Sequence, residues 1–265
     1  MNVLIINLPD SKSRLKFQVE QLTSFDLDYK VINAVSTATL QESEYNALSQ
    51  TWQRPMRASE VACFLSHKKA WHCVVEENRP CLIIEDDALF SRNIVKLLEE
   101  IAGISDLDLV TLENRSRKKI VSKKVTSLCC NSFLYELYQD RTGAAGYILW
   151  PKSAKILINK SDKGKIALAD AFISSSYELK AFQVEPAAIV QLDQCAHYDL
   201  ECDVETQSTI TPVATQHPIA EGLLATVKFK LRRINAQFSM GFRQLSVLNK
   251  SRRRFIKINK HDFTR

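Results

Sequence analysis

The sequence predicts an α/β fold, and two observations support this prediction. Short apolar runs of strand length are bounded by turn residues, and stretches with the apolar spacing of an amphipathic helix stand between them. The expected strands are residues 2–8, 29–35, 81–85, 108–112, 133–137 and 182–191. The expected helices are residues 11–23, 40–48, 59–75, 91–103 and 151–158. The first strand, helix and strand form a βαβ unit, which predicts a parallel strand pair.

Length and composition indicate a globular protein with one main domain. The 265 residues are 45% hydrophobic, which suits one large α/β domain with or without an appendage. We expect a domain over residues 1–220 and a separate basic segment over 221–265. The N-terminus lacks a basic region, and no apolar run approaches the ~18–20 residues of a spanning helix. These features predict a cytoplasmic location.

The seven cysteines are scattered, and several stand in apolar runs. This pattern predicts reduced, mostly buried thiols rather than disulfides. No CxxC spacing occurs, which argues against a zinc site.

The positive charge is concentrated at the C-terminus. Residues 226–265 contain 12 Lys/Arg and a single acid, Asp262, whereas the rest of the chain holds 24 basic and 29 acidic residues. A basic field over the whole protein, as nucleic-acid binding requires, is therefore excluded. Apolar side chains alternate with the basic ones between Val227 and Leu248, a pattern that suits an anionic membrane surface. The alternative is a solvated helix packed on the body.

An acidic run follows the third expected strand. Residues 81–84 are apolar and lead directly into Glu85, Asp86 and Asp87. Open α/β sheets place ligands at the carboxyl ends of their strands. Alternate residues of an extended chain point the same way, so Glu85 and Asp87 can share one ligand while Asp86 faces elsewhere. Two such oxygen donors suit Mg²⁺ or Mn²⁺; the alternative is an acidic surface turn.

Two further segments contain candidate functional residues. In the helix 59–75, for which Ser59 is a plausible N-cap, the spacing places Glu60, His67 and Trp71 near one face. A helical histidine is more often structural than functional. Asp170 is a lone acid in the apolar run 166–173, where it either caps a helix or takes part in chemistry.

Four segments together resemble glycosyltransferase family 25, the bacterial lipooligosaccharide glycosyltransferases. They are Ile5-Ile6-Asn7-Leu8 with Ser11 and Arg14, Glu60-Val61-Ala62-Cys63-Phe64-Leu65-Ser66-His67 with Trp71, Leu82-Ile83-Ile84-Glu85-Asp86-Asp87-Ala88, and Gly143 to Tyr147 followed by Asp170. The second and third, in this order and about 20 residues apart, are specific as a pair. The Gly-Ala-Ala-Gly-Tyr segment departs from the commoner Gly-Thr-x-Ala-Tyr type. The proline often found two residues before the acid is missing at Asp170.

The resemblance implies a GT-A type, Rossmann-like sandwich that binds a nucleotide sugar. It implies inverting transfer of galactose or glucose from a UDP-sugar to a lipid-linked oligosaccharide acceptor, with Glu85-Asp86-Asp87 in place of a DxD motif. Asp87 and Glu85 would hold Mn²⁺ or Mg²⁺. The expected donor-binding residues are Asn7, Leu8, Arg14, Glu60, Ser66, His67, Glu85 and Asp86. Asp170 is the expected general base, with Glu113 and Glu185 as competitors.

A protein active on a lipid-linked acceptor would sit on the inner face of the cytoplasmic membrane, which fits the basic tail. Two other functions remain open on the sequence alone. One is a metal-dependent nucleotidyltransferase or phosphoesterase that uses the same three acids. The other is a glycan-binding protein without catalysis, which would not need them.

Overall fold

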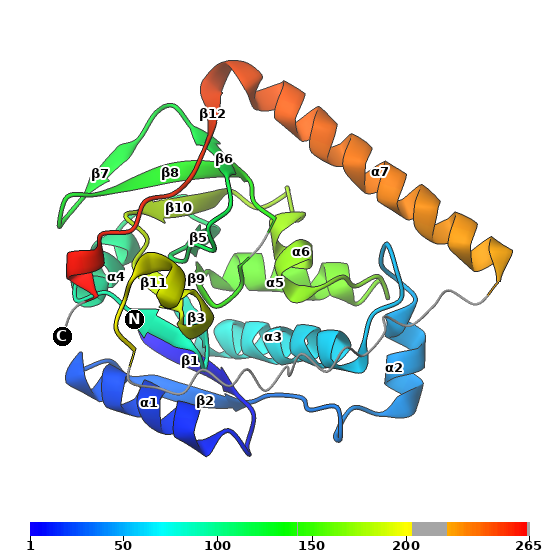
Figure 1. Ribbon diagram of the computed structural model, residues 1–265, viewed down its shortest axis with the longest axis horizontal. Coiled ribbons are helices and arrows are strands. Elements are labelled where there is room, and N and C mark those ends of the chain that lie inside the picture. Colours follow the sequence, from blue (N-terminus) through cyan, green and yellow to red (C-terminus); the bar gives the residue numbers. More distant parts are fainter. Residues whose placement is uncertain (142, 203–221, 264–265) are drawn as a thin grey trace.

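A computed structural model describes residues 1–141, 143–202 and 222–263, and its core is a large mixed β-sheet with helices on both faces (Figure 1). Within these residues the sheet has ten strands, in the order β12-β6-β8-β10-β5-β9-β3-β1-β2, with β7 paired to β8. The strands are β1 (Asn2–Asn7), β2 (Tyr29–Asn33), β3 (Cys81–Glu85), β5 (Leu109–Thr111), β6 (Lys119–Ser122), β7 (Thr126–Leu128), β8 (Ser132–Gln139), β9 (Gly146–Leu149), β10 (Ala181–Glu185) and β12 (Ser251–Arg254). A small second sheet pairs β4 (Ala88–Phe90) with β11 (Ile189–Gln191).

The helices lie largely where the apolar spacing predicts them. They are α1 (Lys12–Ser24), α2 (Glu42–Ser49), α3 (Ala58–Glu77), α4 (Ile94–Ala102), α5 (Pro151–Ser161), α6 (Ala169–Ser174) and α7 (Leu223–Val247). Helix α3 begins slightly before the expected N-cap, with Arg57 as the capping residue. The mixed α/β class is therefore confirmed.

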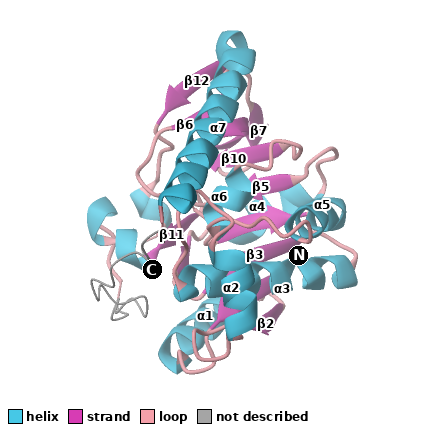
Figure 2. Ribbon diagram, turned by 90° about the vertical axis from the view of Figure 1, so that its right-hand side faces the viewer, coloured by secondary structure: helices cyan, strands magenta, loops and turns pink. Residues whose placement is uncertain are grey.

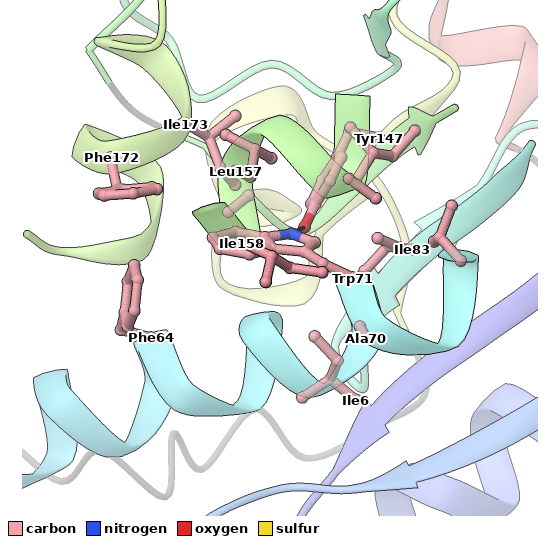
Figure 3. Packing of buried hydrophobic residues seen from close by; sticks show 14 of the residues in the cluster. Ile6, Phe64, Ala70, Trp71, Ile83, Tyr147, Leu157, Ile158, Phe172 and Ile173 are labelled. Carbon is pink, nitrogen blue, oxygen red and sulfur yellow. Dashed lines mark hydrogen bonds between the residues drawn. The ribbon is translucent and has the colours of Figure 1, made fainter. Parts of the chain in front are cut away.

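Alternating side chains of the central strands build a core on each face of the sheet. Leu4 and Ile6 of β1 point into a cluster with helices α3, α5 and α6, whereas Val3 and Ile5 point into a cluster with α4. Aromatic rings join the helices of the first cluster (Figure 3). There Phe172 of α6 has ring-centroid distances of 5.0 Å to Phe64 and 5.8 Å to Trp71.

The strand directions bring several strand ends to one edge of the sheet. β1 pairs in parallel with both β2 and β3, so the predicted βαβ unit is confirmed. β9 runs antiparallel between β3 and β5, which makes β3 and β5 parallel to each other. The carboxyl ends of β1, β3 and β5 therefore lie at the same edge as the start of β9. This is the edge where an open α/β sheet places its ligands.

Residues 115–124 lie outside the strands expected from the sequence, yet they contribute strand β6. Lys119 in this strand is only 1% exposed. Its ammonium forms an ion pair with Asp140 at 2.5 Å and donates to Gln183 Oε1 at 2.6 Å. Partners distant in the sequence thus compensate the buried charge, which a local reading of charge does not reveal.

The C-terminal segment, expected to be separate from the main domain, contains a strand as well as a helix. After α7, which Figure 2 shows running along one side of the molecule, strand β12 pairs antiparallel with β6. Ile256 and Phe263 beyond it are buried in body clusters. Residues 251–263 thus belong to the main body. Among the residues described, no helix is both long and apolar enough to cross a membrane.

The prediction that all cysteines are reduced is wrong for one pair. Cys195 and Cys202 form a disulfide, which closes a short loop after β11. The other five cysteines are free. The spacing of these two residues carried no signal for pairing, because their approach depends on the two 3₁₀ turns after β11 (Leu192–Gln194 and Ala196–Tyr198).

Candidate functional site

The acidic run forms a cluster at the carboxyl end of β3. Asp86 turns toward the first helix, where Asn7 Nδ2 donates to its Oδ2 at 2.8 Å and Arg14 Nη1 donates to its Oδ1 at 3.0 Å. Gln18 of α1, fully buried, donates to the main-chain oxygens of Asp86 and Ala88. The acidic turn is therefore held to α1 by side-chain and main-chain contacts.

The side chains of Glu85 and Asp87 both point away from Asp86 and toward Gln191, as their spacing of two residues predicts. The amide nitrogen of Gln191, at the end of β11, lies 3.4 Å from Glu85 Oε2 and 3.4 Å from Asp87 Oδ1. Arg115 Nη1 in turn donates to Gln191 Oε1 at 2.5 Å and Nη2 pairs with Asp193 at 2.6 Å. The two carboxylates therefore converge on one point from alternate positions of the chain.

A chain of buried polar groups reaches Glu85 from the helical face. Trp71 Nε1 donates to the hydroxyl of Tyr147 at 2.9 Å, and that hydroxyl lies 3.0 Å from His67 Nδ1. His67 Nε2 lies 3.2 Å from Glu85 Oε1. The nitrogen of Trp71 can only donate, so the Tyr147 hydroxyl is free to donate to Nδ1 while Nε2–H donates to Glu85. This tautomer satisfies every group in the chain.

The charges of the cluster fit a divalent cation. Burial and the neighbouring carboxylates of Glu85 and Asp86 raise the pKa of Asp87 to about 7. Burial acts against ionisation of Glu85 as well, but the hydrogen bond from His67 and the charges of Arg115 and Arg14 hold the pKa of Glu85 below its ordinary value. Two carboxylates that converge in this way repel each other. A bound Mg²⁺ or Mn²⁺ would neutralise their charge and take their oxygens as ligands.

A cavity of about 240 Å³ opens beside the acidic cluster. Its walls come from β1 and the loop after it, from the segment after β2, from α3 and from the turn after β3. The lining residues are Ile6, Leu8, Arg14, Ala34, Val35, Ser36, Thr37, Ser59, Ala62, Cys63, Ser66, His67, Glu85, Asp86 and Asp87. The cavity thus brings together the expected metal ligand Asp87 and six of the expected donor-binding residues, which are Leu8, Arg14, Ser66, His67, Glu85 and Asp86.

Two expected donor residues have other contacts. Asn7 is 2% exposed and lies behind Asp86, which it orients. Glu60 forms an ion pair with Arg54 at 2.7 Å and accepts the Arg57 N–H at 2.8 Å, so it caps α3. Despite partial burial, these contacts lower the pKa of Glu60. The structure therefore gives both residues supporting contacts around the cavity.

The three candidate bases lie in different surroundings. Asp170, in the first turn of α6, accepts the Ala171 N–H at 2.7 Å. Its pKa is raised by burial and also by the charges of Glu85 and Asp140. Glu185 is 4% exposed and is held by Arg254 and by the Lys257 N–H, so it anchors the C-terminal segment.

Glu113 lies beyond the end of β5 and is almost fully buried. Its Oε2 accepts the Ala145 N–H at 2.8 Å, whereas its Oε1 has no hydrogen-bond partner among the described residues. Burial raises the pKa of Glu113 to about 8. Gly143, with φ +108°, packs so closely that a Cβ atom there would lie 1.6 Å from Glu113 Oε1. The glycine at this position is thus required by the carboxyl group beside it.

Sequence reasoning missed several residues of this region. Gln191 and Arg115 reach the acids only through the packing of β11 and the loop after β5, and no local pattern marks them. For Cys63 the sequence does contain a signal, since this residue stands one helical turn before His67. Tyr147 ends one of the segments that carry the family resemblance, but the contact of its hydroxyl with His67 was not predicted.

Comparison with known proteins identifies the family. A sequence profile described as glycosyltransferase family 25 (LPS biosynthesis protein) matches residues 1–173. This region contains α1, α3, the acidic turn and Glu113. The chain belongs to glycosyltransferase family 25. It is accordingly an enzyme of the glycosyltransferase class.

Individual relatives agree with this membership. A putative glycosyltransferase of Haemophilus influenzae is 26% identical over 196 residues, which cover 71% of this chain and 69% of the relative. The lipooligosaccharide biosynthesis protein lic2B of Haemophilus influenzae is 26% identical over 194 residues, which cover 66% of this chain and 72% of that protein. Human procollagen galactosyltransferase 2 is 25% identical over 236 residues, which cover 78% of this chain but only 37% of that protein.

Proposed function

We propose that this enzyme transfers a hexose, galactose or glucose, from a UDP-sugar to a lipooligosaccharide core acceptor. Family membership supports the reaction class. The names of two relatives favour a lipooligosaccharide acceptor and a galactosyl donor. The observation that carries the proposal is the convergence of Glu85 and Asp87 beside a cavity that Arg14 also lines. The phosphate groups of a nucleoside diphosphate could bind both a cation held by the two carboxylates and the guanidinium of Arg14.

In this proposal Asp87 and Glu85 hold Mn²⁺ or Mg²⁺. The cation supplies charge neutralisation for the diphosphate leaving group. Arg14 donates to Asp86 at 3.0 Å and also lines the cavity, where the positive charge of its guanidinium would attract the phosphate groups. His67 orients Glu85, and Gln191 holds the Glu85 and Asp87 carboxylates near one another.

We assign the general base to Asp170. An inverting displacement needs one group that accepts the proton of the acceptor hydroxyl. Asp170 is partly exposed, and the charge of Glu85 contributes to its raised pKa, which supports a place near the cleft. Glu185 is engaged by Arg254 and is set aside. Glu113 remains the competitor, and its main-chain contact with Ala145 favours a positioning role instead.

The acceptor proposal extends to the exposed face of α7. Val227, Leu231, Ile234, Phe238, Phe242 and Leu245 follow the helical period and are all exposed. Lysine and arginine side chains flank this apolar stripe, among them Lys228, Lys230 and Arg233. We propose that the stripe rests on an anionic membrane, where a lipid-linked acceptor is presented.

A thermal-shift panel tests the donor proposal. UDP, GDP, dTDP, CDP and ADP are each added with and without Mn²⁺ to the wild-type protein, to Asp87→Asn and to Asp106→Asn. Asp106 is exposed near the opposite end of β5 and serves as a matched control. A ligand at a hundredfold excess over its Kd stabilises the folded state by about 2.7 kcal/mol.

We expect a shift with UDP that requires Mn²⁺, persists in Asp106→Asn and is lost in Asp87→Asn. An absence of any shift with the five nucleotides would contradict the donor proposal. Stabilisation by nucleoside triphosphates, with phosphoester turnover and no sugar transfer, would favour the metal-dependent nucleotidyltransferase or phosphoesterase instead. Normal sugar transfer by Asp170→Asn would eliminate the base assignment.

A further inference from the structure

A thiol, an imidazole and a carboxylate meet on the wall of the donor cavity. Cys63 and His67 stand one turn apart on α3, and Glu85 faces them from the end of β3. One ligand atom from each of the three residues lies within 4.8 Å of the other two. All three residues also line the cavity, so a small ion can reach them from solvent.

We propose that these three residues form a binding site for Zn²⁺ or a similar borderline-soft cation. Sulfur, nitrogen and one carboxylate oxygen are the donor types that Zn²⁺ prefers, and three protein ligands leave its fourth position open. Mg²⁺ and Mn²⁺ favour oxygen donors instead. The site is therefore chemically distinct from the pair Glu85 and Asp87, although it shares Glu85 with that pair.

The surroundings of His67 suit a metal ligand. The nitrogen that does not bind the metal must be held by another group, which fixes the ring. In this protein Nδ1 lies 3.0 Å from the Tyr147 hydroxyl, itself fixed by Trp71. If Nδ1–H donates to that hydroxyl, the Nε2 lone pair faces Glu85 and Cys63. The ion would then replace the His67–Glu85 hydrogen bond. The His67 ring would change its tautomer, and the Tyr147 hydroxyl would accept from Nδ1–H instead of donating to Nδ1.

Occupation of this site has a consequence for the proposed function. An ion bound by Glu85 together with Cys63 and His67 draws that carboxylate away from its shared point with Asp87. We therefore expect Zn²⁺ to oppose the Mn²⁺-dependent binding of UDP. The zinc site itself does not depend on the donor proposal, whereas this antagonism does, and the two are tested by separate readouts.

Absorption spectroscopy with Co²⁺, a spectroscopic substitute for Zn²⁺, tests the site on the full-length protein. A thiolate bound to Co²⁺ gives a ligand-to-metal charge-transfer band, which a purely carboxylate site does not give. The variants are Cys63→Ser and the matched control Cys73→Ser. Cys73 lies on the same helix and is also partly exposed, but its charged neighbours are Lys30, Glu76 and Glu77 rather than the acidic cluster.

We expect the band in the wild-type protein and in Cys73→Ser, its loss in Cys63→Ser, and its removal by an equivalent of Zn²⁺. A band that survives in Cys63→Ser would place the cobalt elsewhere, for example at the adjacent Cys129 and Cys130, and would overturn the proposal. The absence of a band in the wild-type protein would overturn it as well.

A second measurement uses only the wild-type protein, so it tests the zinc site even if the Cys63→Ser variant fails to fold. Alkylation of each free cysteine is followed by mass spectrometry with and without Zn²⁺. Metal coordination blocks thiolate attack, so Zn²⁺ should slow modification of Cys63 at least about tenfold and leave Cys73 unchanged. Equal rates at Cys63 in both conditions would contradict the site, whatever the nucleotide-binding result.

Discussion

At the scale of single residues, ionisation of the buried Glu113 carboxyl group destabilises the folded state. Burial raises its pKa from 4.5 to about 8, so between these values the folded state keeps a proton that the unfolded state has lost. The unfolding free energy must then fall as pH rises through this range. At about 1.4 kcal/mol per pKa unit, the loss attributable to this one group is of the order of a few kcal/mol.

The variant Glu113→Gln tests this linkage, because glutamine has a similar shape and does not titrate. We expect its stability relative to the wild-type protein to increase by roughly a few kcal/mol between pH 5 and pH 9. Urea unfolding at pH 5, 7 and 9 measures the difference. The control is Glu20→Gln, an exposed residue of α1 paired with Lys16. Parallel pH profiles for Glu113→Gln and the wild-type protein would show that Glu113 is ionised in the folded state.

The close contact between Gly143 and Glu113 leads to a second prediction. In Gly143→Ala the new methyl would overlap Glu113 Oε1, and alanine would be forced to φ +108°. We expect a loss of at least about 2 kcal/mol in unfolding free energy, measured by urea denaturation. The matched control is Gly241→Ala in α7, where nothing lies within 4 Å of the new atom and the change should stabilise by about 0.5–1 kcal/mol. Equal stabilities for the two variants would contradict the contact.

Among the elements, β12 is held to the body by a buried ion pair. Arg254 pairs with Glu185, which is 4% exposed. Removing the arginine leaves a buried carboxylate without its cation, which typically costs about 3–5 kcal/mol. The neighbouring Arg253 is exposed, so its removal should change stability by less than about 0.5 kcal/mol. Urea unfolding of Arg254→Ala and Arg253→Ala provides the comparison. Similar stabilities would mean that the pair does not anchor the strand.

Elements with a strong local pattern were predicted from the sequence. β1, β3, α3 and α4 combine apolar spacing with turn residues, and the structure confirms them. β6 and β12 were missed because their charges are compensated by residues far along the chain, Asp140 for Lys119 and Glu185 for Arg254. The run 182–191 was read as one strand, but it forms β10 and β11, with the cis Glu185–Pro186 bond between them.

Contacts between residues far apart in the sequence also limit what could be predicted of the site. Glu85, Asp86 and Asp87 are adjacent, so their alternating directions follow from strand geometry alone. The polar chain from Trp71 to Glu85 joins α3, β9 and β3, and only the fold brings these together. Glu60 shows the opposite case, because its spacing from His67 suggested a shared face while Arg54 and Arg57 draw its carboxylate to the start of α3.

On the scale of the whole molecule, α7 contacts the rest of the protein in both of its halves and is exposed along one side. In the first half Arg232 donates to the main-chain oxygens of Gln50 and Trp52, and near the end Gln244 donates to Gln139 at 2.8 Å. Deleting residues 226–265 to test membrane binding would therefore also remove β12 and the buried Phe263. Substitutions on the exposed stripe test the same question without that damage.

The basic C-terminal residues and the net-acidic remainder of the chain should orient the protein on an anionic surface, with α7 toward the lipid. We expect the wild-type protein to sediment with vesicles that contain anionic phospholipid, and to be released by high salt. Phe238 and Phe242 are 64% and 71% exposed. Burying one such ring in lipid contributes about 1.5–3 kcal/mol, so Phe238→Ser with Phe242→Ser should weaken binding by at least about tenfold. Phe255→Ser removes an exposed ring outside the stripe and should bind normally. Equal sedimentation of the double variant and the wild-type protein would mean that any membrane contact is purely electrostatic, or that the apolar stripe serves another partner.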